Sequence, residues 1–538
     1  MVTSVDVAIV GFGPAGEVLA STLGEAGFKV LVVERWPQPY PLPRLTTLDG
    51  ECCRVVQATS ADVDKGFSES CVQDAVNFTD AEGVPIMRVL YPGEIGGWPA
   101  RLSIFQPDFE AGIAEKVETM PSVEVRRGWE AQEIVQDETG VALKIARYDD
   151  AKMEATDEVE TVRAKYLVGT DGARSFVRQK LDLPVKDFNL HERWLNFDAE
   201  LKRPLPEHFN KLVIFMDPKR PHMYMPIGQR YLRLEFRVME DETDEQVTVP
   251  EVAWDFLTRQ HGLGPDDVRI MRQIVYHYHS RIAEKWSDGR VFIAGDAAHT
   301  MPPYMGQGGC AAIRDGRNLG WKLVEVLSGR SPATLLDTYQ VERQPHVTTI
   351  VMGSDMLSRV VNIVDPVAAE NRNMGMRKDG DRRPPDLPSL TAGILYRGAG
   401  DEVALPAGLA TPQGTLRRGA RWSRGDEILG TWFQIWSRRD LSDVLDDGSR
   451  TWLEANNVGI AVFDDENSAH YAQDCDGTYG AFLDKHGVDV VVVRPDFFAF
   501  GGVAHADINT LIADLARQLG AGAGGQSSPA AGAQELAQ

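Results

Sequence analysis

The chain has 538 residues, of which 43% are hydrophobic and 25% charged, and its formal net charge is −23. A chain of this length exceeds what a single hydrophobic core supports, so we expect two or three domains. The acidic balance opposes general binding to nucleic acid or to an anionic membrane surface, because both are negatively charged. It does not exclude an anionic small molecule, since a few arginines can decide the sign of a pocket.

Five cysteines without a CxxC pair are typical of a reducing compartment, which favours a cytoplasmic location. The first residues, MVTSVDVAIVGFG, lead straight into an apolar strand with Asp6 inside it and lack the pattern of a signal peptide. No run approaches the roughly 18 apolar residues of a membrane span. The sequence therefore predicts a protein that binds neither membrane nor nucleic acid.

A strand–helix–strand unit comes first in the chain. Residues 5–10, VDVAIV, form an apolar run that predicts a buried strand, residues 14–27 have helical spacing, and KVLVVE predicts a second strand. Two strands joined through a helix pair in parallel, so we expect a parallel sheet.

The turn of this unit, GFGPAG, fits the pattern GxGxxG directly after a strand and at the start of a helix. Gly11 permits a tight turn, Gly13 lets a pyrophosphate approach the backbone, and Gly16 lets the helix pack closely on the strand. Glu34, at the end of the next strand, can accept hydrogen bonds from a ribose. The unit therefore predicts a bound dinucleotide, NAD or FAD. The predicted binding residues here are Gly11, Gly13, Pro14, Ala15, Gly16, Glu34 and Arg35.

The rest of the chain changes style several times. Alternating segments between about 190 and 280 predict a mainly antiparallel sheet, and about 310–364 is helical. A segment rich in Arg, Pro and Gly then precedes a small α/β unit. The predicted organisation is a discontinuous dinucleotide-binding domain (1–185 and 280–370), an inserted substrate-binding sheet domain (186–279), a linker (371–394), a C-terminal domain (395–520) and a disordered tail (521–538).

A second glycine-rich stretch, VFIAGDAAHTMPPYMGQGGCAAIRDGRNLGWKL, runs from residue 291 to 323. Together with AKYLVGTDGARSFVR (164–178) and the first glycine loop, it resembles the single-component flavoprotein aromatic hydroxylases over about residues 5–365. This resemblance implies FAD as the cofactor and an α/β fold with a Rossmann-like FAD-binding domain. The stretch VVVVRPDFFAFG resembles the end of the thioredoxin-like C-terminal domain of one subgroup.

A flavin is long, so a loop other than the one at Gly11 must hold its ribityl chain and ring. Asp296 can accept hydrogen bonds from ribityl hydroxyls, and the start of the helix near Cys310 can face the flavin N1/C2 edge with its positive end. His299 is interpreted as part of the hydrogen bonding of this loop. In the family, the Asp171 segment is associated with FAD and the reduced nicotinamide. The further predicted flavin-binding residues are Arg44, Gln106, Asp171, Gly295, Asp296, Pro303, Gly306, Gln307, Gly308 and Gly309.

The resemblance implies a monooxygenase in which NADH or NADPH reduces FAD and a flavin C4a-hydroperoxide hydroxylates a phenolic ring. The partners are then a small phenolic substrate and O2, and a homodimer is left open. Cys310 and the stretch LLDTYQVERQPH point to 3-(3-hydroxyphenyl)propionate hydroxylase and phenol-hydroxylase-like enzymes of aromatic catabolism. The alternative is an FAD-dependent tailoring oxygenase, a hydroxylase or epoxidase, of a polyketide-like substrate. No metal site is predicted.

A base that deprotonates the phenol would raise the electron density of the ring. Asp49, in TTLDGECCR, resembles the Asp of phenol hydroxylases that lies beside the substrate hydroxyl, although Asp-Gly is also a common turn pair. Asp49 is therefore the predicted catalytic base. The predicted substrate-binding residues are His222, Tyr224 and Pro302.

Overall fold

The computed structural model describes residues 3–398 and 402–520, and the predicted disordered tail, 521–538, lies outside them. The chain divides into two compact units, each of which is drawn from several segments. The first unit comprises Met1–Gly320, Arg343–Ser389 and Pro412–Gly414, and the second comprises Trp321–Glu342, Leu390–Thr411 and Thr415–Gln538.

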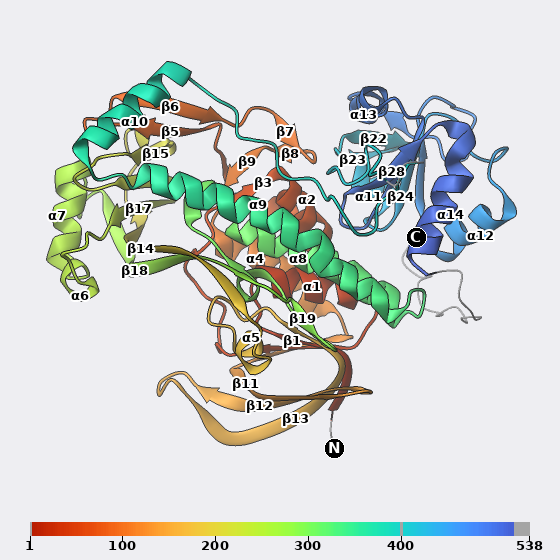
Figure 1. The fold of residues 1–538 in the computed structure, drawn as a ribbon, viewed down its shortest axis with the longest axis horizontal. Coiled ribbons are helices and arrows are strands. Elements are labelled where there is room, and N and C mark those ends of the chain that lie inside the picture. The colour runs from red at the N-terminus through yellow and green to blue at the C-terminus, as the bar shows by residue number, and fades with distance from the viewer. Residues whose placement is uncertain (1–2, 399–401, 521–538) are drawn as a thin grey trace. The chain divides into compact units, whose positions relative to one another are not determined.

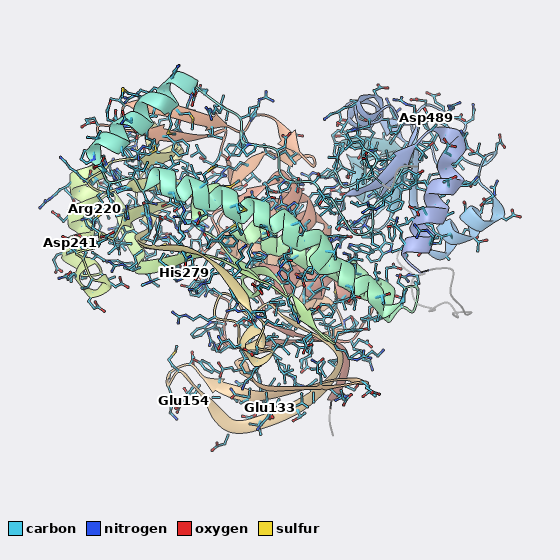
Figure 2. All side chains as sticks on the ribbon, in the orientation of Figure 1. Glu133, Glu154, Arg220, Asp241, His279 and Asp489 are labelled. Carbon is cyan, nitrogen blue, oxygen red and sulfur yellow. The ribbon has the colours of Figure 1, made fainter. Side chains whose placement is uncertain are left out.

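A mixed sheet organises the N-terminal part of the first unit. Its parallel part has the order β10-β2-β1-β13-β20, and β12 and β11 extend β13 in antiparallel pairing. Figure 1 labels β1, β11, β12 and β13. The acidic side chains of Glu133 and Glu154 lie on this antiparallel extension (Figure 2). The strands of this sheet are β1 (Thr3–Val10), β2 (Val30–Glu34), β10 (Val123–Arg127), β11 (Trp129–Asp137), β12 (Gly140–Asp149), β13 (Glu154–Gly169), β19 (Ser287–Asp288) and β20 (Val291–Ile293).

The first strand–helix–strand unit forms as predicted, because β1 and β2 are fully apolar in their buried parts and pair in parallel. Helix α1 starts with Pro14 at its first position, where the missing N–H costs nothing. Helix α8 lies close to α1, since Gly316 and Gly320 present no side chain to it. The helices of the first unit are α1 (Pro14–Glu25), α2 (Gly50–Thr59), α3 (Val63–Gly66), α4 (Gln106–Thr119), α5 (Phe176–Lys180), α6 (Asp244–Val247), α7 (Pro250–His261) and α10 (Pro366–Asp379), together with most of α8 (Gly308–Leu327) and α9 (Thr338–Val361).

The predicted antiparallel sheet has the order β21-β18-β14-β17-β16-β15-β5-β6, and only β15 and β5 pair in parallel. Two of its strands come from residues 75–90, outside the predicted domain 186–279. Its strands are β5 (Ala75–Thr79), β6 (Pro85–Leu90), β14 (Val185–Leu201), β15 (Leu212–Phe215), β16 (His222–Ile227), β17 (Tyr231–Arg237), β18 (Val268–Ala283) and β21 (His299–Thr300).

Both faces of this sheet carry clusters of buried side chains, which pack against different partners. One face packs on α7 and on the short helix η1 (Glu207–Asn210) through Phe197, Tyr224 and Phe236. The other face, which carries Trp194 and Met223, clusters with Tyr304. Tyr304 belongs to the short helix η3 (Pro303–Met305) of the second glycine-rich stretch. We call this second face the loop-facing face of the sheet.

Two small sheets complete the first unit. The three-stranded sheet has the order β3-β9-β4 and brings the segment after Arg44 beside residues 101–103. Its strands, and those of the two-stranded sheet, are β3 (Thr47–Asp49), β4 (Cys71–Val72), β9 (Arg101–Ser103), β7 (Glu94–Ile95) and β8 (Trp98–Pro99).

The predicted linker, 371–394, begins inside a helix. Helix α10 continues to Asp379, because the Asp365 side chain caps it by accepting from the Ala368 amide and Pro366 occupies its first turn. Beyond it, Arg382 exchanges main-chain hydrogen bonds with the β6 segment, accepting from Leu90 at 2.7 Å. No single helix of the described ranges is long and apolar enough to cross a membrane, and the one pair that passes together, Ala333–Val361 with Pro366–Asp379, is bent by 119°.

The second unit has its own sheet of order β25-β24-β27-β28, in which only β24 and β25 are parallel. Arg494, in the stretch VVVVRPDFFAFG, is fully buried and pairs with Glu342 at 2.6 Å and with Asp496 at 2.7 Å. Cys475 is exposed and is the only cysteine in this unit's sequence. The elements of this unit are η4 (Ala333–Asp337), β22 (Thr415–Arg418), β23 (Arg421–Arg424), α11 (Gly425–Leu429), β24 (Gln434–Ser437), α12 (Asp447–Ala455), β25 (Gly459–Val462), β26 (Gln473–Asp474), α13 (Thr478–His486), β27 (Val490–Val493), β28 (Ala499–Val503), η5 (His505–Asp507) and α14 (Ile508–Gln518).

Gly316→Ala tests the close approach of α8 to α1. A Cβ at this position would lie 2.6 Å from the Ala15 carbonyl oxygen, so the two helices must separate. We expect a loss of about 1–3 kcal/mol in the free energy of unfolding, measured by urea denaturation of the apoprotein. The matched control is Gly375→Ala in α10, whose Cβ would meet nothing within 4 Å. That variant should gain about 0.5–1 kcal/mol, and equal effects of the two substitutions would contradict the packing argument.

Candidate active site

The glycines of the first loop are of two kinds: two are closely packed, and one faces open space. A Cβ on Gly11, whose φ is +101°, would lie 2.5 Å from the Thr170 carbonyl oxygen, and one on Gly16 would lie 2.3 Å from the Gly11 carbonyl oxygen. A Cβ on Gly13 would meet nothing within 4 Å. Gly11 and Gly16 are therefore required by the fold itself, whereas the space at Gly13 suits a ligand that approaches the main chain at the N-terminus of α1.

Glu34 is held beside this loop by two main-chain donors. Its Oε2 accepts from the Phe12 amide and its Oε1 accepts from the Trp36 amide, both at 2.9 Å. This fixes the carboxylate at the end of β2, where a ribose of the dinucleotide would pass. Arg35 is exposed and pairs instead with Glu130 at 3.3 Å.

Gln106 shapes the segment that presents Arg44. Its Oε1 accepts from the amides of Arg44 at 2.7 Å and Leu45 at 2.6 Å, and its Nε2 donates to Glu110 at 2.6 Å. The side chain is thus occupied by protein groups and positions the segment. The Arg44 guanidinium is exposed and stacks over the Tyr40 ring at 4.3 Å, so it is available to a phosphate.

Asp296 is exposed among buried neighbours at the turn after β20. Its carboxylate makes no hydrogen bond with any residue that the structure describes, and desolvation by the surrounding protein raises its pKa, which His299 opposes. Gly295, with φ +62°, allows the turn, and its missing side chain leaves room for Ala312. An unpaired acceptor held on a tight turn suits the hydroxyl groups of a ribityl chain.

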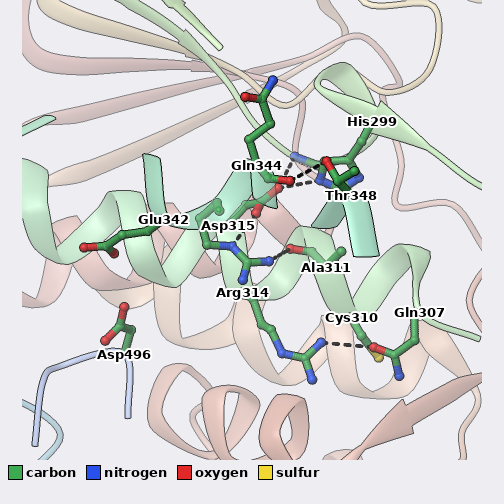
Figure 3. Close-up of polar contacts among 12 residues, drawn as sticks. His299, Gln307, Cys310, Ala311, Arg314, Asp315, Glu342, Gln344, Thr348 and Asp496 are labelled. Carbon is green, nitrogen blue, oxygen red and sulfur yellow. Dashed lines mark hydrogen bonds and ion pairs between the residues drawn. The ribbon is translucent and has the colours of Figure 1, made fainter. Parts of the chain in front are cut away.

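Asp315 of α8 holds this turn in place through hydrogen bonds, and Figure 3 draws Asp315 with His299. Its Oδ2 accepts from the Gly295 amide at 3.1 Å and contacts His299 Nε2 at 2.7 Å, while Oδ1 accepts from Arg343 Nε at 2.8 Å. Burial opposes ionisation, but His299 and Arg343 hold the pKa of Asp315 below its usual value. The interpretation of His299 as part of the loop's hydrogen bonding is confirmed, and Asp315 and Arg343 are the partners that sequence reasoning missed.

The second half of the stretch leads into α8. Pro303 is exposed, whereas Pro302 is buried and its carbonyl accepts from Ser354 Oγ at 2.6 Å. A Cβ on Gly306 would lie 2.5 Å from Thr47 Oγ1 and one on Gly309 would lie 2.7 Å from the Leu45 side chain. At Gly308, where α8 begins, the nearest atom would be 3.9 Å away, so the positive helix end is open to a ligand.

Asp49 is fully engaged by the protein. Its Oδ1 caps α2 by accepting from the Cys52 amide at 3.0 Å. Its Oδ2 accepts from Gln307 Nε2 at 2.9 Å and from Arg314 Nη2 at 2.7 Å (Gln307 and Arg314 are drawn in Figure 3). Burial opposes ionisation, but Arg314 and these hydrogen bonds keep the pKa of Asp49 below its usual value. This geometry argues against the predicted role of Asp49 as the base and favours a role in joining α2 to α8.

One side of Asp49 also meets two thiols. Ligand atoms of Asp49, Cys52 and Cys310 lie within 4.8 Å of one another. Arg314 already neutralises the carboxylate, and burial raises the pKa of the Cys52 thiol well above its ordinary value. This donor set therefore suits a metal ion poorly, because thiols bind metals as thiolates.

Asp171 lies where β13 ends, close to the first glycine loop. Its Oδ2 accepts from the Val177 amide at 3.0 Å, and its buried Oδ1 has no partner within the described residues. Burial raises the pKa of this carboxyl group. Asp171 therefore has one acceptor atom available for a hydrogen bond beside the predicted cofactor-binding site.

His222 and Tyr224 point away from this region. In β16 they alternate with Met223 and lie on the face that packs against α7. His222 stacks between Phe215, at 4.4 Å, and Phe236, at 5.6 Å between ring centroids. Their positions argue against the predicted contact with substrate, since a strand turns alternate side chains to opposite faces.

The geometry fits FAD. The open Gly13 and the N-terminus of α1 suit a pyrophosphate, Glu34 a ribose, the unpaired Asp296 a ribityl chain, and the open start of α8 the flavin ring. A family model described as an FAD binding domain matches residues 4–354. The chain belongs to the FAD-dependent aromatic hydroxylases. FAD is its cofactor and reduced nicotinamide its electron donor; when bound, the reduced flavin activates O2 for insertion of one oxygen atom.

Two curated relatives match almost the whole of this hydroxylase. A protein named probable NADH-specific resorcinol 4-hydroxylase from Rhodococcus jostii (strain RHA1) is 33% identical over 530 residues, which cover 96% of this chain and 94% of the relative. The 3-(3-hydroxy-phenyl)propionate/3-hydroxycinnamic acid hydroxylase of Mycolicibacterium smegmatis is 32% identical, with 96% and 93% covered.

Solved structures with the same fold include the flavin-dependent monooxygenase PieE in complex with FAD and substrate. That structure matches with a TM-score of 0.78 and 21% identity, covering 96% of this chain and 99% of the other. A ternary complex of aklavinone-11 hydroxylase with FAD and aklavinone matches with a TM-score of 0.73 and 22% identity, with 96% and 99% covered. A second family model, described as the HcaD C-terminal domain, matches residues 408–518 of the hydroxylase.

Asp296→Ala should weaken FAD retention more than Glu34→Ala. Asp296 offers an unpaired carboxylate to the ribityl chain, whereas both oxygens of Glu34 already accept hydrogen bonds from main-chain amides. We expect a loss of about 1–3 kcal/mol for the deleted hydrogen bonds at Asp296, which is roughly 5- to 150-fold in the dissociation constant. The measurement is FAD fluorescence on titration of the deflavinated variants. Full flavin content of Asp296→Ala after long dialysis would remove Asp296 from the site.

Asp49→Asn tests whether Asp49 joins α2 to α8 or acts as the catalytic base. Loss of the carboxylate leaves Arg314 with Glu51, at 2.9 Å, as its one acidic partner among the described residues, so we expect a loss of about 3 kcal/mol in the free energy of unfolding. The flavin-loaded fraction should still couple NADH oxidation to product as the wild type does. Glu51→Gln is the control for charge loss beside Arg314. A stable, fully loaded Asp49→Asn that releases peroxide instead of product would restore Asp49 as the base.

Proposed function

We propose that this hydroxylase acts on a small phenol of the resorcinol kind and uses NADH as its reductant. The main support comes from the loop-facing face of the sheet, where Glu235 and Asn196 place oxygen acceptors among apolar side chains. Met223 and Trp194 supply the flat apolar surroundings that suit an aromatic ring. Free acceptors suit a neutral molecule that carries hydroxyl groups, as the full-length similarity to a resorcinol hydroxylase also favours.

The two arginines on this face, Arg233 and Arg272, already form ion pairs with a carboxylate of the protein. Arg233 Nε pairs with Asp198 at 2.8 Å, and Arg272 pairs with the same carboxylate. Both guanidinium groups also donate to the Pro43 carbonyl. They thereby tie the segment before Arg44 to the sheet, and they offer no free charge to a substrate carboxylate.

A second candidate substrate is a phenol with a carboxylate side chain, and Arg101 favours it. Arg101 is 6% exposed and pairs with no carboxylate in the part of the chain that the structure describes. Its Nη1 donates to the Met305 carbonyl at 3.2 Å, and its buried Nε has no acceptor. A buried cation without an acid beside the flavin loop suits an anionic group of the substrate.

The two units support finer fold assignments. The parallel order β10-β2-β1-β13 around the glycine loop favours a Rossmann-like domain. The second unit runs β24-α12-β25-α13-β27-β28-α14 with sheet order β25-β24-β27-β28, and this order favours a thioredoxin-like domain. Its single exposed cysteine, Cys475, lacks the second thiol that disulfide exchange needs, so we assign this domain no redox role.

The setting of the enzyme follows from its chemistry. A need for reduced nicotinamide and five free cysteines fits the cytoplasm, where thiols stay reduced. The homodimer remains a prediction that sedimentation of the holoenzyme measures.

Substrate-stimulated NADH oxidation by the FAD-loaded enzyme tests the proposed function. We expect resorcinol to accelerate NADH oxidation and to yield product in near equimolar amount, with NADPH clearly slower. Stimulation by 3-(3-hydroxyphenyl)propionate alone, lost in Arg101→Met, would support the carboxylate-bearing substrate instead. Turnover of a multi-ring polyketide but of neither phenol would overturn the proposal in favour of the tailoring oxygenase.

A further inference from the structure

A polar pair interrupts an apolar row across the loop-facing face. Strand pairing places Ile214, Met223, Glu235, Asn196 and Ile274 side by side, each opposite the next on β15, β16, β17, β14 and β18. Directly opposed residues of antiparallel strands share a face, so the row is continuous. Burying a carboxyl group in the middle of such a row is costly unless it serves a purpose.

Glu235 is only partly satisfied by the protein. It is 3% exposed, and its Oε1 accepts from Asn196 Nδ2 at 2.8 Å. Arg233 Nε is 3.9 Å from the same oxygen, beyond hydrogen-bond distance. The Oε2 atom makes no hydrogen bond with any described residue, although it is not sealed from solvent as the fully enclosed polar atoms are. One carboxyl oxygen is therefore held and the other is available.

Two polar atoms of the residues beside Glu235 can each make one more hydrogen bond. The Asn196 Oδ1 atom is buried and accepts from no group within the described ranges. The Tyr278 hydroxyl accepts from Asn196 Nδ2 at 3.3 Å, and its own proton is not donated to any described residue. Glu235, Asn196 and Tyr278 thus present two acceptors and one donor at one place. A substrate hydroxyl can use two of these atoms at once, by donating its proton to Glu235 Oε2 and accepting from the Tyr278 hydroxyl.

The face that carries this group meets the two segments that are predicted to hold the flavin, the one after Arg44 and the second glycine-rich stretch. Tyr304 of η3 packs edge-on against Trp194, with 5.9 Å between ring centroids, in the same cluster as Met223 and Met225. Thr46, two residues beyond Arg44, contacts the Met225 sulfur at 3.6 Å. A phenol between the sheet and the second glycine loop would therefore have its ring among these apolar side chains and its hydroxyl at Glu235.

The charges that face Glu235 come from three strands and one loop. Arg233 lies on its own strand, Asp198 on β14, Arg272 and Tyr278 on β18, and Tyr304 on η3. Asp198 forms ion pairs with both arginines, so its negative charge weakens their electrostatic effect on Glu235. Burial raises the pKa of Glu235 to about 7, with Arg233 opposing the rise. A carboxyl group with this pKa is a stronger base than an exposed one and still ionises near neutral pH.

We propose that Glu235 is the catalytic base that accepts the phenolic proton of the substrate, with Tyr278 donating to the phenolic oxygen and Asn196 positioning the Glu235 carboxyl group. The substrate O–H bond breaks, its proton moves to Glu235 Oε2, and the electron pair stays on the phenolate oxygen. Tyr278 donates to that oxygen, and Asn196 keeps Glu235 Oε1 in place. Charge on the oxygen raises the electron density of the ring carbons beside and opposite it, where an electrophilic oxygen attacks. This inference rests on the proposed function, since it needs a phenolic substrate.

Glu235→Gln is the direct test, because a glutamine oxygen can still accept from Asn196 but cannot take up a proton. With the phenol that the wild type turns over, we expect kcat to fall by about 10²- to 10⁴-fold, with peroxide released in place of product. In the wild type, kcat/KM should rise with pH through a midpoint near 7, since the base must be ionised. That step should vanish in Glu235→Gln, while its FAD content and melting temperature stay at wild-type values.

An acidic phenol supplies a second readout. A fluorinated resorcinol that is already ionised at the assay pH no longer needs a base, so it should restore most of the coupling in Glu235→Gln. Glu200→Gln is the matched control, because Glu200 lies on β14 but is half-buried and pairs with Arg269. It should behave as the wild type does with both phenols.

The outcomes separate this inference from the proposed function. If the wild type turns over no phenol, the proposed function fails first. If the wild type is active and Glu235→Gln keeps its rate, coupling and pH profile, Glu235 is a structural bridge between strands and the inference is wrong. Equal loss of activity with the ordinary and the acidic phenol would also overturn it, because the defect would then not concern a proton.

Discussion

The buried carboxylate of Asp315 is the interaction on which the geometry of the site depends. It joins three pieces that are far apart in sequence, by accepting from the Gly295 amide, His299 and Arg343. The turn that presents Asp296, the body of α8 and the body of α9 are therefore fixed to one another. A buried acid with one partner would be costly, but with three donors its charge is compensated and its position is rigid.

Local patterns were enough to predict the frame of the enzyme. GFGPAG between a strand and a helix fixed the parallel unit around Gly11 and Gly16, whose missing side chains the fold requires. The alternating segments between 190 and 280 became the strands of one antiparallel sheet. These features depend on residues close in sequence, where the period of apolar residues and the demands of a turn leave few options. The joining of β5 and β6 to that sheet has no such local signal.

Side-chain roles that depend on distant partners could not be read in the same way. Asp49 resembles a catalytic Asp by its neighbours in sequence, but its engagement depends on Arg314, 265 residues away. His222 and Tyr224 had suitable chemistry on a predicted strand. A period of two says that they share a face, and only the packing of α7 on that face decides that it is turned away from the flavin loop. Glu235 gave no signal beyond being an acid inside an apolar strand, YLRLEFR.

The balance of buried charge shows where the chemistry of this hydroxylase is concentrated. Most buried ions here are paired: Arg314 with Asp49, Arg343 with Asp315, and Arg233 and Arg272 with Asp198. Such pairs position segments but leave nothing to act on a ligand. Glu235 and Arg101 differ, because one keeps a carboxyl oxygen without a hydrogen bond and the other keeps a guanidinium without an acid. Because an unbalanced buried group raises the energy of the free protein, it is retained where a substrate supplies the missing partner. The acid suits a hydroxyl and the cation suits an anion, so the choice between a neutral and a carboxylate-bearing phenol depends on these two residues.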